Sequence, residues 1–120
     1  MMNPTSTKVA ETMHRGLEQC NVEMILSCYA DDANVRIVDT THPPSKPMEL
    51  KGKSAIADYY RDICSRKMTH SVDQEIISDS QLAFTESCQY PDGKRVLATE
   101  MCELSNGKIR RQTNLQVWDS

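Results

Sequence analysis

The sequence lacks a charge surplus and long apolar runs, and each absence excludes a class of protein. Its 120 residues include 14 basic and 17 acidic side chains, with no long run of like charge, which argues against nucleic-acid binding. No apolar run approaches the roughly 18 residues of a membrane-spanning helix, and the N-terminal residues contain no signal-peptide core. We therefore expect a cytoplasmic protein that binds neither nucleic acid nor membrane.

The sequence also lacks linkers, internal repeats and any cofactor motif. Its length suits a single domain, residues 1–120, with one core. No arrangement of histidine, cysteine and acidic residues resembles a zinc or iron site, and no glycine-rich phosphate loop is present, so we expect no cofactor. The five cysteines are scattered and odd in number, which favours reduced core residues over a disulfide framework.

Three helices are expected in the first half of the chain. The first begins at a cap within residues 5–7 and turns an apolar stripe inward. Asn21 is expected to cap a short second helix that ends in residues 30–33. The third helix spans about 53–66 and follows a proline-rich loop, 40–51. The stripe of the first helix consists of Val9, Met13, Leu17 and Cys20.

One strand is expected early and four late. Residues 34–39 form the first, and from residue 69 onward apolar side chains alternate with polar ones. Turn residues at 79–80, 91–93 and 105–107 divide this second half into four runs of roughly ten residues, a meander of hairpins. Helices that precede a run of strands predict an α+β domain with the helices on one face of the sheet.

Two glutamates interrupt the apolar faces of the strands on either side of residues 91–93. With a three-residue loop there, Glu86 lies opposite Ala98. Phe84 then lies opposite Glu100, and the two carboxylates are diagonal neighbours on one face. A loop of two or four residues would place them on opposite faces. The apolar partners on each strand favour the three-residue loop.

A carboxylate on an apolar face needs a partner, a raised pKa or a wet pocket, because burying its ionised form costs several kcal/mol. Two such groups a few ångströms apart cannot both ionise cheaply, so one pKa should rise well above the other. Glu86 and Glu100 would then supply an acid and a base near neutral pH. The alternative is a structural pair, bonded to arginines and polar side chains of the last strand.

Four segments together resemble a known family. They are Tyr29-Ala30-Asp31-Asp32-Ala33, Gly52-Lys53-Ser54-Ala55-Ile56 before Tyr59-Tyr60, residues 83–93 (AFTESCQYPDG), and Asn106-Gly107-Lys108-Ile109. In this order they resemble the nuclear transport factor 2-like superfamily, in its SnoaL-like and ketosteroid-isomerase-like branch. The resemblance implies a cone, in which a curved antiparallel sheet wraps around the N-terminal helices in the order α-α-β-α-β-β-β-β. It also implies a pocket at one end and a homodimer through the outer face of the sheet.

The resemblance to ketosteroid isomerases is partial. Glu100 aligns with an acid that an apolar site holds neutral, so that its protonated form donates to the developing oxyanion. Tyr29 and Tyr60 align with two tyrosines of the network behind the oxyanion hole. Met13 replaces the third tyrosine, which is the direct donor. Steroid isomerisation by that mechanism is therefore not expected.

The general base of those enzymes aligns with Ile37, and Asp39 lies two residues further along the same face of the strand. Asp39 is therefore a reserve candidate for a base. His70 shares a face with Val72 and Ile76 and is interpreted as a core residue rather than a base.

The last strand, residues 109–118, can be oriented in two ways. Alternation buries Ile109, Leu115 and Val117, with Arg111 as a possible partner for the glutamates. The family alignment instead leaves those three apolar side chains on the outer face, where a dimer interface would cover them. We follow the alignment, which turns inward Gln112, Asn114, Gln116 and Trp118.

Two functions from different classes remain. The first is an isomerase, cyclase or dehydratase that moves a proton on a small apolar substrate. The second is a non-catalytic dimeric module that binds a small hydrophobic or amphipathic molecule or assembles with itself. The catalytic candidates are Glu100, Glu86 and Asp39. The expected pocket is lined by Met13, Leu17, Tyr29, Ile37, Tyr60, Phe84, Cys88, Cys102, Gln112, Asn114, Gln116 and Trp118.

Overall fold

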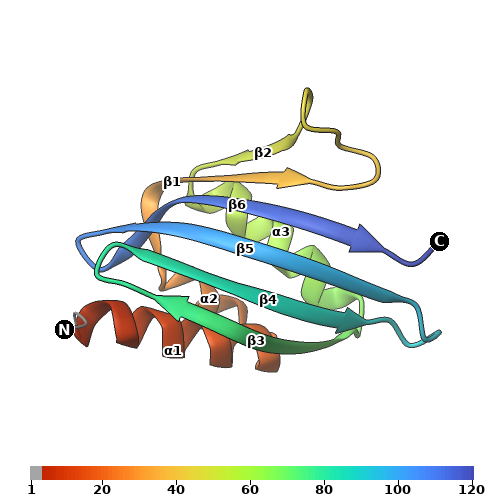
Figure 1. Ribbon diagram of the computed structural model, residues 1–120, viewed down its shortest axis with the longest axis horizontal. Helices are drawn as coiled ribbons and strands as arrows, with labels where there is room; N and C mark the ends of the chain where they lie inside the picture. The colour runs from red at the N-terminus through yellow and green to blue at the C-terminus, as the bar shows by residue number, and fades with distance from the viewer. Residues whose placement is uncertain (1–3) are drawn as a thin grey trace.

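The computed structural model describes residues 4–120, which form an open six-stranded sheet with the helices on its inner face (Figure 1). The elements in chain order are α1 (Pro4–Gln19), α2 (Val22–Leu26), β1 (Tyr29–Val38), β2 (Met48–Lys51), α3 (Lys53–Ser65), β3 (Thr69–Ile77), β4 (Gln81–Gln89), β5 (Arg95–Ser105) and β6 (Lys108–Trp118). Neighbours across the sheet follow the order β2-β1-β6-β5-β4-β3. The predicted α+β cone is confirmed, with a curved, unclosed sheet around the helices.

The meander of antiparallel strands from β3 to β6 is confirmed, and its turns fall where the sequence predicts them. The other half of the sheet differs from the expectation. β1 pairs with β6 in parallel, so the sheet is not wholly antiparallel. β2 lies inside the expected loop 40–51 and pairs with β1, so the expected element order lacks one strand. Alternation predicts which face a side chain takes but not the direction of the neighbouring strand.

α1 begins earlier than the sequence pattern predicts. Residues 5–7, expected to form its cap, lie inside the helix, which already includes Pro4. Ser6 is buried and donates its hydroxyl to the carbonyl oxygen of Asp79 at 2.7 Å, which fastens the helix to the β3–β4 turn. The cap prediction is therefore wrong. A hydroxyl near the start of a helix can form a tertiary hydrogen bond instead of capping the helix.

Asn21 caps α2 as predicted, and its Oδ1 accepts a hydrogen bond from the backbone N–H of Met24 at 3.1 Å. The helix stops well before residues 30–33, which belong to β1, so the predicted helix end is wrong. Strand pairing explains the early end, because the backbone N–H of Ile109 donates to the carbonyl oxygen of Cys28 at 2.7 Å.

The core lies between the helices and the inner face of the sheet. The stripe of α1 faces it, with Val9, Met13 and Leu17 buried as predicted. Gly16 lets α1 approach α2 closely, since a Cβ at this position would lie 2.9 Å from Cγ1 of Ile25. No helix within residues 4–120 has the length and apolar character needed to cross a membrane.

Cys20 and Cys64 form a disulfide, with their Cα atoms 5.5 Å apart. Cys20 directly follows α1, and Cys64 lies in the last turn of α3. The expectation of reduced cysteines is wrong for this pair, because two helix ends far apart in sequence meet only in the folded chain. Cys28, Cys88 and Cys102 carry free thiols, and Cys28 and Cys102 are buried as expected.

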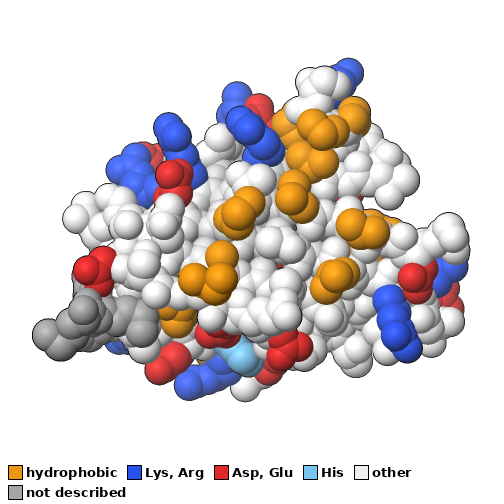
Figure 2. Space-filling view, viewed as in Figure 1, with side chains coloured by type: hydrophobic (Ala, Val, Ile, Leu, Met, Phe, Trp, Pro, Cys, Tyr) orange, Lys and Arg blue, Asp and Glu red, His pale blue; other side chains and the backbone are white. Residues whose placement is uncertain are grey.

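The inward face of β6 follows the family alignment from Gln112 onward, while Ile109 departs from it. Ile109 is 0% exposed, although the alignment places it on the outer face. The pairing of β5 with β6 skips Arg110, and this bulge lets both Ile109 and Gln112 face inward. Leu115 and Val117 are exposed on the outer face as expected. Figure 2 looks onto that face and shows apolar side chains spread across it, with charged groups mostly at the margins.

Candidate functional site

Glu86 of β4 and Glu100 of β5 lie on the inner face of the sheet, on strands joined by the turn at 91–93. The pairing of Glu86 with Ala98 confirms the register that a three-residue loop requires. Glu86 is 7% exposed and Glu100 is 2% exposed, and their carboxyl groups are hydrogen-bonded to each other. Arg111, the alternative partner from the last strand, is exposed. The two carboxyl groups therefore share a site that is nearly free of water.

The protonation of these two carboxyl groups is unequal. Burial, and then the charge of Glu86, raises the pKa of Glu100 well above its ordinary value. Burial also opposes the ionisation of Glu86, but hydrogen bonds from Glu100 and His70 outweigh it and hold the pKa of Glu86 below its ordinary value. Glu86 is therefore the member of the pair that ionises first, and Glu100 holds its proton more firmly.

A chain of hydrogen bonds between neutral side chains extends from Glu100. Gln112 Nε2 donates to Glu100 Oε1 at 3.0 Å and to Asn114 Oδ1 at 2.8 Å. The Tyr29 hydroxyl donates to Gln112 Oε1 at 2.6 Å, and the hydroxyl oxygens of Tyr29 and Tyr60 are 2.9 Å apart. The two tyrosines therefore reach Glu100 through Gln112 rather than directly.

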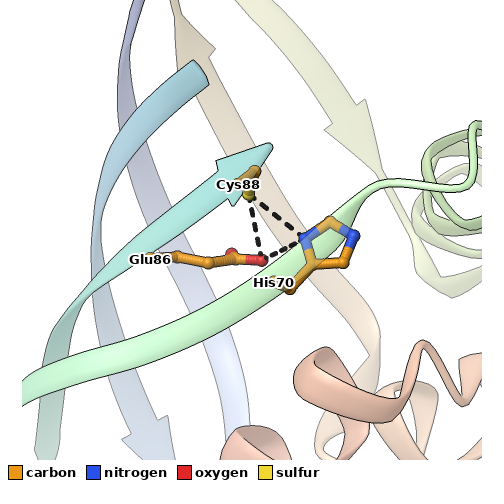
Figure 3. A group of neighbouring side chains, drawn as sticks. All are labelled: His70, Glu86 and Cys88. Carbon is orange, nitrogen blue, oxygen red and sulfur yellow. Dashed lines mark hydrogen bonds and ion pairs between the residues drawn. The ribbon is translucent and has the colours of Figure 1, made fainter. Parts of the chain in front are cut away.

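His70 and Cys88 form a cluster with Glu86 (Figure 3), because His70 of β3 lies opposite Cys88 of β4. His70 Nδ1 is 2.9 Å from Glu86 Oε2 and 3.1 Å from Cys88 Sγ, and that sulfur is 3.5 Å from the same oxygen. The nitrogen, oxygen and sulfur atoms that these three side chains could offer to a metal ion lie within 4.8 Å of one another. Hydrogen bonds alone account for this arrangement. The His70 side chain is 3% exposed, and its Nε2 has no hydrogen-bond partner among residues 4–120.

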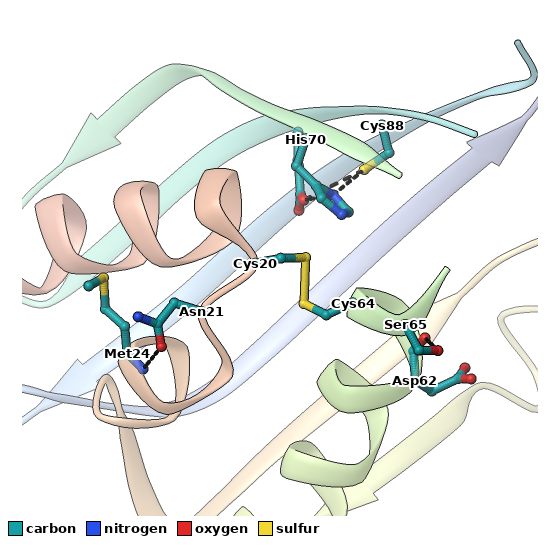
Figure 4. The surroundings of a disulfide bond; sticks show 9 residues. Cys20, Asn21, Met24, Asp62, Cys64, Ser65, His70 and Cys88 are labelled. Carbon is teal, nitrogen blue, oxygen red and sulfur yellow. Dashed lines mark hydrogen bonds and ion pairs between the residues drawn. A yellow bond between two sulfur atoms is a disulfide. The ribbon is translucent and has the colours of Figure 1, made fainter. Parts of the chain in front are cut away.

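A cavity of about 50 Å³ lies beside these groups. Figure 4 shows the disulfide of Cys20 and Cys64 on the helical side, facing His70 and Cys88 on the sheet. The partly exposed ring of Trp118 forms part of the wall toward solvent. The expected site residues that line the cavity are Leu17, Tyr60, Glu86, Cys88, Glu100, Asn114, Gln116 and Trp118. Lining residues that the sequence reasoning did not assign to a pocket include Cys20, Tyr59, Cys64, Met68, His70 and Tyr90.

The other expected pocket residues pack in the core instead of lining the cavity. Met13 and Ile37 are apolar and fully buried at the positions where the resemblance implies a donor and a base. Both side chains belong to the packed core, and neither adds a polar group to the cavity wall. The buried residues away from the cavity are Met13, Tyr29, Ile37, Phe84, Cys102 and Gln112.

Asp39 lies in the turn after β1 and does not line the cavity. Its Oδ1 accepts hydrogen bonds from the backbone N–H groups of Thr41 and His42, both at 2.9 Å. Burial opposes its ionisation, but the hydrogen bonds from His42 and Thr41 hold the pKa of Asp39 below its ordinary value. Asp39 therefore does not join Glu86 and Glu100 in one site, because these hydrogen bonds hold its carboxylate in the turn.

Two cavity residues, Tyr59 and His70, are not assigned to the site by the sequence reasoning. Tyr59 lies three residues after Ile56, so the helical period places it on the inward side of α3. His70 would be harder to find, because the pairing of β3 with β4 shifts by one residue between Asp73 and Ile76. If the pairing of β3 with β4 is counted back from the turn between them without that shift, His70 lies opposite a residue other than Cys88.

Solved structures share this fold at low sequence identity. An NTF2-like protein of unknown function from Mesorhizobium loti matches with a TM-score of 0.79 and 13% identity, covering 97% of this chain and 96% of that chain. The Δ5-3-ketosteroid isomerase from Mycobacterium sp. matches with a TM-score of 0.70 and 17% identity, covering 92% and 91%. A candidate polyketide cyclase from Sinorhizobium meliloti matches with a TM-score of 0.69 and 12% identity, covering 89% and 93%. These likenesses concern the fold alone.

Sequence comparison assigns the family. Among curated proteins, none matches this chain. The model of the SnoaL-like domain matches residues 10–112, which include both glutamates and every strand except the end of β6. The chain therefore belongs to the SnoaL-like domain family and has the fold of NTF2-like proteins.

Proposed function

We propose that this protein binds a small, largely apolar molecule in the cavity and transfers a proton on it, as an isomerase, cyclase or dehydratase does. The observation that carries the proposal is the buried pair of Glu100 and Glu86 at the cavity wall, in which the pKa of Glu100 is raised and that of Glu86 is lowered. In this proposal Glu100 is the acid at neutral pH and Glu86 is the carboxylate. Acid–base chemistry near neutral pH needs one group that donates a proton and one that accepts it. Two neighbouring titratable groups can supply both when their environments separate their pKa values.

Tyr59 adds a hydrogen-bond donor to the cavity wall. Gln116 Nε2 donates to the Tyr59 hydroxyl oxygen at 3.0 Å, which leaves the hydroxyl hydrogen for a ligand. Burial raises the pKa of Tyr59, so the hydroxyl keeps this hydrogen at neutral pH. A carbonyl oxygen of the bound molecule could accept it, and negative charge developing on that oxygen would be stabilised.

The size of the cavity favours a small substrate. Pockets for drug-sized ligands measure about 300–1,000 Å³, whereas this cavity measures about 50 Å³. A compound of a few carbon atoms fits these dimensions, and a steroid does not. The apolar Met13 and Ile37, both fully buried, also argue against the ketosteroid isomerase mechanism. The proposed substrate is therefore a small carbonyl or hydroxyl compound.

The outer face of the sheet favours a second candidate, a non-catalytic dimeric module. This face exposes an apolar patch that consists of Leu97, Met101, Leu115 and Val117. Thr99 and Thr113 lie between these side chains in the strand pairing, so the middle of the patch carries no charge. Such a face suits a second copy of the same chain, because a twofold interface buries the same residues on both sides. A homodimer through this patch is compatible with either function.

Deuterium uptake from D₂O by small ketones tests the enzymatic proposal. We expect the protein to accelerate exchange into acetone or hydroxyacetone, measured by proton NMR. Glu100→Gln should lower that rate by about 100-fold, within the usual contribution of a general acid or base. The control Glu103→Gln changes an exposed residue of the same strand and should leave the rate unchanged. Exchange no faster than in buffer for every ketone would contradict the enzyme and favour the dimeric module.

A further inference from the structure

Glu86 already accepts hydrogen bonds from three neighbours. His70 Nδ1 and the Cys88 thiol both reach its Oε2, at 2.9 and 3.5 Å, and Glu100 is also hydrogen-bonded to it. Burial, and then the charge of Glu86, raises the pKa of Cys88, so the sulfur keeps the hydrogen that it donates. A carboxylate offers about four lone-pair sites, so little of Glu86 remains available to a substrate.

The same contacts assign the hydrogen on the ring of His70. Its Nδ1 faces a carboxylate oxygen and the Cys88 sulfur, so Nδ1 carries the hydrogen and donates it. Nε2 is then a bare lone pair, buried and without a partner among the described residues, on a side chain that lines the cavity.

We propose that His70 Nε2 is the base that meets the substrate, and that Glu86 is a positioning residue that acts through His70. This inference rests on the proposed function and assigns a further catalytic residue to the same cavity. The Glu86 carboxylate would fix the orientation and tautomer of the ring and stabilise the imidazolium that forms, as carboxylate–histidine pairs do in other enzymes. The hydrogen bond from Glu100 would keep Glu86 ionised for that role.

The proposed step moves one proton and leaves the redox state unchanged. Nε2 takes a proton from the carbon next to a substrate carbonyl, so an N–H bond forms while a C–H bond breaks. The electron pair of that C–H bond moves toward the carbonyl oxygen, which becomes an enolate oxygen and accepts the hydrogen bond of Tyr59. The imidazolium then returns the proton to a substrate carbon. The substrate class is a small aldehyde or ketone with hydrogen on the neighbouring carbon.

Nitrogen NMR of the histidine side chains tests the assignment without a substrate, since the chain has only three histidines. We expect His70 to carry its hydrogen on Nδ1 and to have a bare Nε2 at neutral pH. Glu86→Gln should weaken this preference, because a neutral amide does not require a donor at Nδ1. A hydrogen on Nε2 with a bare Nδ1 would overturn the proposal. A change in the Nδ1 signal on adding EDTA would also overturn it, because the cluster would then hold a metal ion through Nδ1.

The variant His70→Asn separates this proposal from the proposed function. Asparagine can place an N–H group near the position of Nδ1 but has no atom in place of Nε2. We expect the ketone exchange rate to fall by about 100-fold or more, while His14→Asn, outside the cavity, leaves it unchanged. Exchange that persists in His70→Asn but is lost in Glu100→Gln would overturn the role of His70 and leave the proposed function intact. A wild-type protein without exchange would contradict both.

Discussion

Two regions of the inner sheet face, a packed core and a cavity wall, are built by the same alternation of side chains, yet they differ in chemistry. In the core region, β4 contributes Phe84 to a packed apolar cluster. Four residues further along the same strand, Cys88 lines a cavity with His70 and the two glutamates. Burial is similar in both regions, but the cavity wall combines buried polar groups with unfilled space.

This contrast shows what determines a site in the fold. A position on the inner face is necessary, but the helix above it decides whether the position is core or cavity. Met13 of α1 packs in the core region, and the disulfide of Cys20 and Cys64 lines the cavity. Polar residues are tolerated around the cavity because each finds a partner there, except for Nε2 of His70 among the described residues.

The largest expected effect is the loss of packing in the core region. Phe84→Ala should lower the free energy of unfolding by about 3–5 kcal/mol, because it removes a buried aromatic ring and leaves a void. Trp118→Ala, which truncates a partly exposed ring at the cavity wall, should cost less than half as much. Urea denaturation of both variants measures the difference, and equal losses would show that the two regions are packed alike.

Removal of the disulfide should have the next largest effect. The double variant Cys20→Ser, Cys64→Ser should lose about 2–4 kcal/mol of stability, because the bond closes a long loop with a sequence separation of 44. Wild-type protein measured with and without a reducing agent provides the matched comparison. If the reductant leaves the unfolding midpoint unchanged, the bond does not stabilise the folded chain.

The pH dependence of stability reports on the buried carboxyl pair at the cavity wall. Because the pKa of Glu100 is raised by folding, wild-type stability should fall as pH rises from the ordinary value of 4.5 toward the raised one. The slope is at most about 1.4 kcal/mol per pH unit. Glu86 has a lowered pKa, so its contribution is lost only as pH falls below 4.5.

Thermal unfolding of wild type and Glu100→Gln from pH 5 to 8 measures this slope. The variant has no carboxyl group at residue 100, so its stability should be flatter over the range. Glu103→Gln, exposed on the same strand, should follow the wild-type profile. Parallel profiles for wild type and Glu100→Gln would mean that Glu100 is ionised in the folded protein.

The sequence predicts regular features of this fold well, and it fails where an extra residue or a distant contact intervenes. The register of β4 with β5 follows from the turn at 91–93, and it correctly predicts that the two glutamates are neighbours. The bulge at Arg110 changes the face of the sheet on which Ile109 lies. The alternation of apolar and polar residues in the sequence does not reveal an extra residue of this kind. The register shift in β3 likewise hides the contact between His70 and Cys88.

Contacts between distant segments are the other part of the site that pattern cannot supply. The parallel pairing of β1 with β6 and the bond between Cys20 and Cys64 both join parts of the chain that only folding brings together. The burial of Met13 in the core likewise depends on how α1 packs, not on the strand pattern.

The central claim is that Glu100 is a carboxylic acid at neutral pH, and infrared spectroscopy tests it most directly. The difference spectrum between wild type and Glu100→Gln at pH 7 should contain the carbonyl band of a protonated carboxyl group, contributed by the wild type. The band should shift in D₂O, as expected for an O–H group. A difference spectrum that shows only the bands of an ionised carboxylate would contradict the account.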